Sequence, residues 1–205
     1  MKAHTRKSQS EVTPAMALEY LKEGNQRFVS NLQVNRDLLQ QVNETADGQF
    51  PFAVILSCID SRTSAELIFD QGLGDIFSAR VAGNVVNEDI LGSMEYSCKV
   101  AGSKLVLVIG HTKCGAITAA CNRVKLGNIT KLLGKVGPAI EMVEKDVSDI
   151  RSEEAIKQVT IENVRVSIKN IRNNSEILAQ LEKEGEIKIT GGIYDVESGE
   201  VEFFE

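Results

Sequence analysis

The sequence predicts an α/β fold, in which a central, mostly parallel β-sheet is flanked by helices, with an N-terminal helical arm and a C-terminal strand. Three short runs rich in β-branched and apolar residues, at 52–57, 75–81 and 105–109, are typical of buried parallel strands. Each run precedes a segment with helical spacing of apolar residues. A chain of 205 residues, 42% of them hydrophobic, can bury one substantial core, so we expect a single domain over residues 1–205.

The arm is expected over residues 1–46 and the α/β core over residues 47–205. Thr13 followed by Pro14 favours the start of a helix, because proline is well accommodated in the first helical turn. Apolar residues then recur at roughly helical spacing, at Ala17, Leu18, Leu21, Phe28 and Val29. We expect this apolar side to cover either another subunit or the chain's own core, with neither alternative favoured.

Start and stop signals predict the remaining elements. Thr63 and Glu66 match a capping box, which predicts a helix directly after the first strand. Gly185 is a natural helix terminator, and residues 187–204 alternate as a strand or hairpin does. Further helices are expected over 88–99 and 114–124, through Met142 and Val143, and over 154–184 with a break at 173–175.

Composition restricts the class of partner. The net charge of −6 and the pI near 5.2 argue against nucleic-acid binding, which needs a clustered excess of Lys and Arg. The sequence contains no apolar run of about 18 residues, so we expect no membrane span, and its first ten residues do not resemble a secretory signal. We therefore expect a cytoplasmic protein that acts on a small molecule.

Three residues with metal-binding side chains fall at the predicted strand ends. Cys58 ends the first strand, and His111 and Cys114 lie just past the third. Because ligands of parallel α/β sheets bind outside the carboxyl ends of the strands, these side chains can converge. Two thiolates and an imidazole suit zinc, and three protein ligands leave a fourth tetrahedral position for water, as in catalytic sites. The pattern predicts one catalytic Zn²⁺ per chain.

Each of these residues also has a simpler interpretation. A cysteine at a strand end is often a small buried hydrophobe, and His-x-x-Cys alone is a weak motif. Cys98 and Cys121 lie within predicted helices among apolar neighbours, so we expect them in the core. The four cysteines are too few and too unevenly spaced for a disulfide framework.

Asp60 and Arg62 directly follow Cys58, which places a carboxylate and a guanidinium beside any metal on that thiolate. Arginine can grip a carboxylate bidentately and fix its orientation. An aspartate held in this way stays ionised, accepts a hydrogen bond from a metal-bound water, and is kept from the metal itself. The alternative is a solvated pair that caps the following helix.

Two motifs together resemble the paired signature of β-carbonic anhydrases: Cys58-Ile-Asp-Ser-Arg62 and His111-Thr-Lys-Cys-Gly115. Two further segments extend the resemblance over most of the chain, namely Arg80-Val-Ala-Gly-Asn84 and Gly192-Ile-Tyr-Asp195. The resemblance implies that Cys58, His111 and Cys114 bind zinc and that the Asp60–Arg62 dyad governs access to it.

The same resemblance implies substrate-binding residues. These are Gln49, Phe77, Ala82, Gly83, Tyr96 and Gly115. Gln49, Phe77 and Tyr96 match the plant-like branch, where they act across a dimer interface, so a homodimer or a dimer-based oligomer is implied. Val81 and Ala82 depart from the family's pattern, and the chain has no Trp for the bicarbonate pocket of the other branch.

The implied reaction is reversible hydration of CO₂ to bicarbonate and a proton, by attack of a zinc-bound hydroxide. Two alternatives stay open: a hydrolase of the same fold acting on CS₂ or COS, and a non-catalytic zinc protein with Asp60 as the fourth ligand. The chain has two histidines; His111 is assigned to zinc, and His4 is expected in a mobile polar tail. Proton export would then depend on Asp60, Tyr96, water and external buffer.

Overall fold

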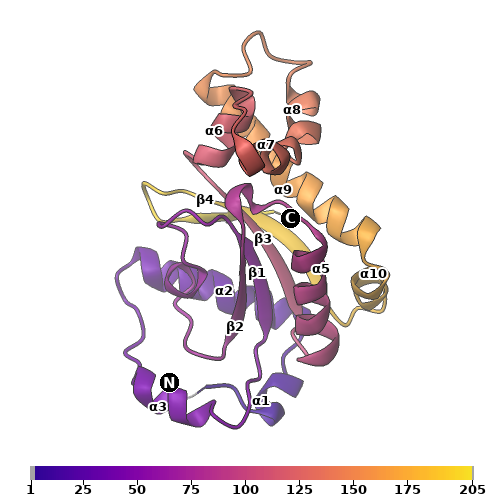
Figure 1. Ribbon diagram of the computed structural model, residues 1–205. Coiled ribbons are helices and arrows are strands. Elements are labelled where there is room, and N and C mark those ends of the chain that lie inside the picture. Colours follow the sequence, from indigo (N-terminus) through magenta and orange to yellow (C-terminus); the bar gives the residue numbers. More distant parts are fainter. Residues whose placement is uncertain (1–2, 205) are drawn as a thin grey trace.

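The computed structural model describes residues 3–204 and shows the predicted α/β architecture (Figure 1). A five-stranded sheet has the strand order β2-β1-β3-β4-β5. Its strands are β1 (Ala53–Ser57), β2 (Ile76–Arg80), β3 (Leu105–His111), β4 (Lys188–Tyr194) and β5 (Val201–Phe203). The first four are parallel, and β5 returns antiparallel to β4 as a hairpin. The carboxyl ends of β1 and β3 therefore meet at one edge of the sheet.

Helices cover both faces of the sheet and its carboxyl edge (Figure 1). They are α1 (Arg6–Ser10), α2 (Pro14–Val29), α3 (Leu38–Glu44), α4 (Ala65–Ile68), α5 (Glu88–Glu95), α6 (Gly115–Cys121), α7 (Gly127–Gly134), α8 (Gly137–Val143), α9 (Glu153–Asn174) and α10 (Glu176–Lys183). A 3₁₀ turn, η1, spans Ala82–Asn84, and a π-helical segment, η2 (Tyr96–Val100), continues α5. Within residues 3–204, no helix is both long and apolar enough to cross a bilayer.

Alternation along the strands sorts their apolar side chains onto two faces. In β1, Ala53 and Ile55 pack on the side of α2, whereas Val54 and Leu56 pack on the side of α5, α9 and α10. Strand β3 divides in the same way, with Leu105, Leu107 and Ile109 on the first side and Val106 and Val108 on the second. Because both faces are covered there, β1 and β3 are continuous apolar runs, as predicted for buried strands. Strand β2 forms where it was predicted but lies at the edge of the sheet, where Ser78 and Arg80 are exposed, so the expectation of a fully buried strand is wrong for it.

The arm helix α2 covers the chain's own sheet. Thr13 caps it by accepting a hydrogen bond from the Met16 amide, as the Thr13-Pro14 signal predicted. Ala17 and Leu21 are fully buried against the first side of the sheet. Of the two alternatives for this helix, cover within the chain is the one observed. Helix α3 differs, because its apolar residues are exposed: Leu38, Leu39 and Val42.

The predicted capping box at Thr63 is wrong. Helix α4 begins at Ala65 after Ser64, and no side chain caps it. The Thr63 hydroxyl lies 2.9 Å from the carbonyl oxygens of both Cys58 and Asp60 and donates to this pair instead. The hydroxyl therefore serves the preceding loop rather than the following helix.

His4 does not lie in a free tail, contrary to expectation. Its ring packs edge-on against Phe52, with centroids 5.6 Å apart, and lies 6.3 Å from the ring of Tyr20. Its Nδ1 is 3.2 Å from the Ser8 hydroxyl. Phe52 directly precedes β1, so His4 lies at the opposite edge of the sheet from Cys58.

A buried ion pair ties the segment between α2 and α3 to the core. Asp70 Oδ2 accepts from Arg27 Nε at 2.6 Å and from the Val34 amide at 3.2 Å, and Asp70 Oδ1 accepts from Arg36. The Asp70 and Arg36 side chains are 3% and 8% exposed. Burial raises the pKa of Asp70, but hydrogen bonds from the two arginines outweigh it, so the pKa is below its ordinary value.

We expect Asp70→Asn to destabilise the fold by about 3–5 kcal/mol, because it leaves Arg36 buried without a counter-charge. Asparagine tolerates the left-handed φ of 46° at this position, so backbone strain does not contribute. Since the folded pKa is lowered, the stabilisation is complete above the unfolded value of about 3.9 and is lost as pH falls further. Urea unfolding at neutral pH measures the effect; a midpoint shift no larger than that of the exposed-pair variant Asp149→Asn would refute it.

Candidate metal centre

Three predicted ligands come together at the carboxyl edge of the sheet. Cys58 directly follows β1, and Cys114 is the residue before α6. His111 is the last residue of β3, where it pairs with Tyr194 of β4. It was expected just past the end of the strand, but β3 is two residues longer than predicted. Lys113 adopts a left-handed φ of 55°, which turns the chain from β3 into α6.

The three donor atoms are arranged closely enough for one metal ion. The two sulfurs and a ring nitrogen of His111 lie within 4.8 Å of one another, and the two sulfurs are 3.9 Å apart. Tetrahedral zinc with Zn–S bonds near 2.3 Å requires an S–S separation of about 3.8 Å. All three residues are buried, with 4%, 1% and 1% of their surface exposed for Cys58, His111 and Cys114. The donor set therefore fits zinc in both chemistry and spacing.

The His111 ring is held in the tautomer that a metal needs. Its Nδ1 lies 2.9 Å from the Thr112 carbonyl oxygen and donates to it, so in the neutral ring the free lone pair is on Nε2. Nε2 is buried and has no hydrogen-bond partner among residues 3–204. A buried acceptor without a partner is costly in a folded protein, and metal coordination is a standard way to satisfy it.

The two sulfurs lie close to each other and to a backbone amide. The Gly83 amide donates to Cys58 Sγ at 3.4 Å. The hydrogen bond with the Cys114 thiol lowers the pKa of Cys58 below its ordinary value. The same bond, together with burial, raises the pKa of Cys114. Two sulfurs this close, with the pKa of one lowered, form a site that favours a cation.

Arg62 holds the Asp60 carboxylate in a bidentate grip. Arg62 Nε donates to Asp60 Oδ1 at 2.9 Å and Nη2 donates to Oδ2 at 2.8 Å, while the Arg62 amide also donates to Oδ1 at 3.0 Å. The hydrogen bond from the Arg62 side chain is the main reason that the pKa of Asp60 lies well below its ordinary value. Asp60 Oδ2 is 4.0 Å from His111 Nε2, so an ionised carboxylate borders the donor cluster.

Arg80 supports this loop in a way that sequence reasoning missed. Its Nε donates to the Cys58 carbonyl at 3.1 Å and its Nη2 to the Asp60 carbonyl at 2.6 Å. Together with Thr63, Arg80 fixes both carbonyl groups of the segment that carries Cys58 and Asp60. The available signal was the position of Arg80 at the end of β2, beside β1 in the sheet.

The six expected substrate-binding residues do not form one group in the single chain. Gly83 contacts Cys58 through its amide, and Ala82 and Gly115 are chain neighbours of Gly83 and Cys114. Phe77 and Tyr96 pack together, with ring centroids 6.2 Å apart, and line a separate cavity of about 710 Å³ that does not include the three donors. Gln49 is exposed before β1, at the opposite edge of the sheet from Cys58.

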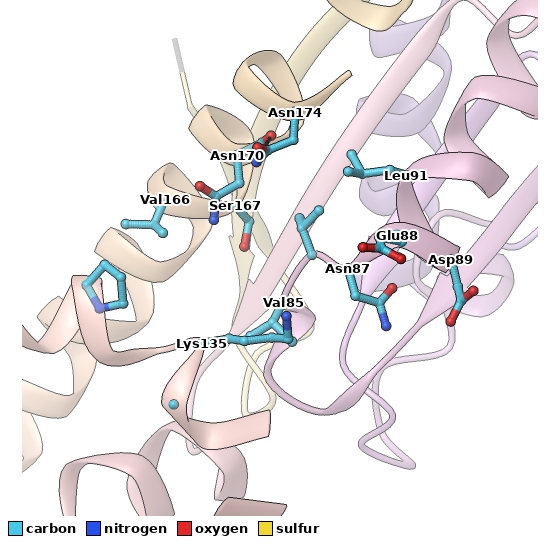
Figure 2. Close-up of a pocket in the computed structure, with 13 residues that line it drawn as sticks. Val85, Asn87, Glu88, Asp89, Leu91, Lys135, Val166, Ser167, Asn170 and Asn174 are labelled. Atoms are coloured by element: carbon cyan, nitrogen blue, oxygen red, sulfur yellow. Dashed lines mark hydrogen bonds between the residues drawn. The ribbon is translucent and has the colours of Figure 1, made fainter. Parts of the chain in front are cut away.

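A cavity of about 730 Å³ lies between the start of α5 and helix α9 (Figure 2). Its lining mixes apolar residues with amides and charges, including Val85, Glu88, Lys135, Ser167 and Asn170. None of the three donor residues lines it. The cavity is therefore distinct from the candidate metal centre, although Val85 directly follows the η1 turn that contacts Cys58.

Sequence and structure comparisons with known proteins point to the same family. The family model for carbonic anhydrase matches residues 53–201. Carbonic anhydrase 2 of Mycobacterium tuberculosis is 36% identical over 91% of this chain and 90% of its own length, and a carbonic anhydrase of Mycolicibacterium smegmatis is 34% identical over 92% of each. The solved structure of the β-carbonic anhydrase CcaA superposes with a TM-score of 0.75 at 27% identity, covering 92% of this chain and 95% of that one. These matches and the arrangement of the site establish that the chain belongs to the β-carbonic anhydrase family.

Proposed function

We propose that the chain is a zinc enzyme that hydrates carbon dioxide reversibly to bicarbonate and a proton, with the metal held by Cys58, His111 and Cys114. Carbonic anhydrase chemistry follows from the family. The observation that supports zinc in this chain is the buried triad itself, whose two sulfurs and one imidazole nitrogen lie within 4.8 Å of one another. Zinc bound by three protein ligands lowers the pKa of a water in its fourth position, which supplies a hydroxide nucleophile near neutral pH.

Asp60 has two tasks in this mechanism. As an ionised carboxylate beside the donor cluster, its Oδ2 can accept a hydrogen bond from the nucleophilic water and so direct the lone pair of that water toward the carbon of CO₂. Arg62 holds both carboxylate oxygens and thereby keeps Asp60 from acting as a fourth protein ligand. Because this ion pair keeps the fourth position free of a protein ligand, it supports a catalytic zinc site over a purely structural one.

Stopped-flow kinetics of CO₂ hydration tests the proposal, with hydrolysis of CS₂ and COS measured on the same preparation. A related hydrolase acting on CS₂ or COS would keep every ligand, so geometry alone does not separate the two activities. We expect rapid CO₂ hydration and little turnover of the sulfur compounds. Fast CS₂ or COS hydrolysis with CO₂ hydration at the uncatalysed rate would assign the other substrate class.

We expect the smallest active unit to be a homodimer. Gln49 lies at the opposite edge of the sheet from its own Cys58, so it can assist catalysis only from another subunit. The apolar residues of α3 are also exposed within residues 3–204, with Leu39 at 73%. Analytical ultracentrifugation at assay concentration should show a dimer or a larger assembly. A fully active monomer would refute this expectation.

Turnover should depend on external buffer. Histidine is the usual proton shuttle near neutral pH, but His111 belongs to the metal centre and His4 packs on Phe52 at the far edge of the sheet. At saturating CO₂ and constant ionic strength, we expect kcat to rise with buffer concentration while kcat/KM stays constant. His4→Ala should leave this profile unchanged. Buffer-independent turnover down to low buffer concentration would reveal an internal shuttle.

A further inference from the structure

Helix α9 reaches the neighbourhood of the metal centre through two buried polar side chains. Asn163 Nδ2 donates to the Gly83 carbonyl at 2.8 Å, and Ser167 Oγ donates to the Asn84 carbonyl at 3.0 Å. The two residues lie one helical turn apart, on the same side of α9, and are only 1% and 2% exposed. Figure 2 shows Ser167 extending from α9 toward the segment at Val85.

The turn that receives these hydrogen bonds has an unfavourable backbone conformation. Gly83 has φ +70°, and Asn84, which carries a side chain, has φ +44°. Left-handed residues persist where the surrounding structure holds them. A bond from the Asn84 amide to the Val81 carbonyl at 2.9 Å closes the turn, and the two contacts from α9 fix its carbonyl groups.

Gly83 connects this turn to the metal centre. Its carbonyl accepts from Asn163, and its amide donates to Cys58 Sγ at 3.4 Å. Helix α9 is itself closely seated on the sheet, since a Cβ added at Gly110 or Gly191 would come within 2.8 or 2.5 Å of the Val164 side chain. A well-seated helix can hold the turn at a constant distance from the Cys58 sulfur.

We propose that Asn163 and Ser167 are positioning residues for the metal centre, which hold the η1 turn so that the Gly83 amide stays on Cys58 Sγ. The inference rests on the proposed role of Cys58 as a zinc ligand. The N–H···S hydrogen bond fixes the direction of the sulfur toward Cys114 and His111, and it withdraws electron density from the thiolate. Loss of either contact should misplace the sulfur and make it a stronger electron donor.

Two substitutions test the proposal on the whole protein. Asn163→Asp keeps the shape of the side chain but replaces the donor with a carboxylate, and Ser167→Ala removes only the hydroxyl. The matched control is Thr160→Val, since Thr160 is buried at 4% on the same helix and its hydroxyl donates to Ile156 within α9. Ser167→Thr restores a hydroxyl and serves as the rescue variant.

The readouts are the zinc dissociation constant, from competition with a chromophoric chelator, and the absorption spectrum of the Co²⁺-substituted protein. We expect both test variants to bind zinc about tenfold more weakly, in line with other residues that orient metal ligands. Their thiolate-to-cobalt charge-transfer band should also move to longer wavelength, because the sulfur has lost a hydrogen bond. Thr160→Val and Ser167→Thr should match the wild type in both measurements.

The outcomes separate this inference from the proposed function. The zinc assignment would be overturned if the wild-type protein bound no zinc and showed no thiolate-to-cobalt band with Co²⁺. The positioning role alone would be overturned if the wild type showed this band but both test variants had the same spectrum and zinc affinity as the wild type. Effects of equal size in Thr160→Val would also overturn it. If Asn163→Asp does not fold, the comparison of Ser167→Ala with Ser167→Thr decides the question.

Discussion

Cys58→Ser, His111→Asn and Cys114→Ser should each lose zinc almost completely after dialysis, whereas the wild type should retain one ion per chain. Each change removes one of the three protein donors grouped in this buried site, and the oxygen or amide that replaces it is a poor match for the same geometry. Hydration activity should fall to the uncatalysed rate in parallel. Metal analysis by mass spectrometry on purified protein measures the zinc content directly.

The other two cysteines provide the matched controls. Cys98 and Cys121 are buried as predicted, at 6% and 2% exposure, and burial raises the pKa of Cys98 to about 12, so it remains a thiol. Cys98→Ser and Cys121→Ser should therefore retain zinc. Full zinc content in the Cys58→Ser protein, or equal loss in all four cysteine variants, would refute the ligand assignment.

Arg62→Ala should lower kcat/KM on the order of 10- to 100-fold while zinc content stays at the wild-type level. The substitution removes the bidentate grip on Asp60, so the carboxylate is free to rotate toward the metal or away from the nucleophilic water. Arg62→Lys should recover only part of the loss, because lysine cannot bind both carboxylate oxygens in the same way. Stopped-flow hydration kinetics and metal analysis on one preparation provide both quantities.

The chain contains a second Asp-x-Arg pair that serves as the control. Arg151 donates to Asp149 through its Nε and its amide, both at 3.0 Å, in the loop before α9. The local geometry resembles that of Asp60 and Arg62, but Asp149 does not border the donor cluster. Arg151→Ala should leave hydration unchanged. Wild-type kinetics in Arg62→Ala would remove the dyad from the mechanism.

The strands and the metal ligands could be predicted because local sequence determines them. The apolar runs that form β1 and β3 are buried along their whole length, so their composition alone identifies them, whereas β2 at the sheet edge leaves Ser78 and Arg80 exposed. Cys58 and His111 follow from the same reasoning, since the carboxyl ends of neighbouring parallel strands coincide. The close approach of the three donors is then a consequence of topology.

Other features depend on contacts between distant parts of the chain, which local patterns do not encode. Asn163 bonds to Gly83 across 80 residues, and nothing near Asn163 in the sequence distinguishes it from other polar helix positions. Thr63 matched a capping box, but its hydroxyl found nearer acceptors in the preceding loop. His4 lies in a polar segment, yet its ring packs on Phe52. For Asn163 and His4 a tertiary contact determined the outcome over local propensity, and for Thr63 a competing local contact did so.

The most direct test of the central claim is to titrate metal-free protein with zinc and to measure CO₂ hydration by stopped flow, with zinc quantified in the same samples. We predict that the hydration rate rises in proportion to bound zinc and saturates at one ion per chain. The account would be contradicted by hydration in the metal-free protein, or by full zinc occupancy with hydration no faster than the uncatalysed reaction.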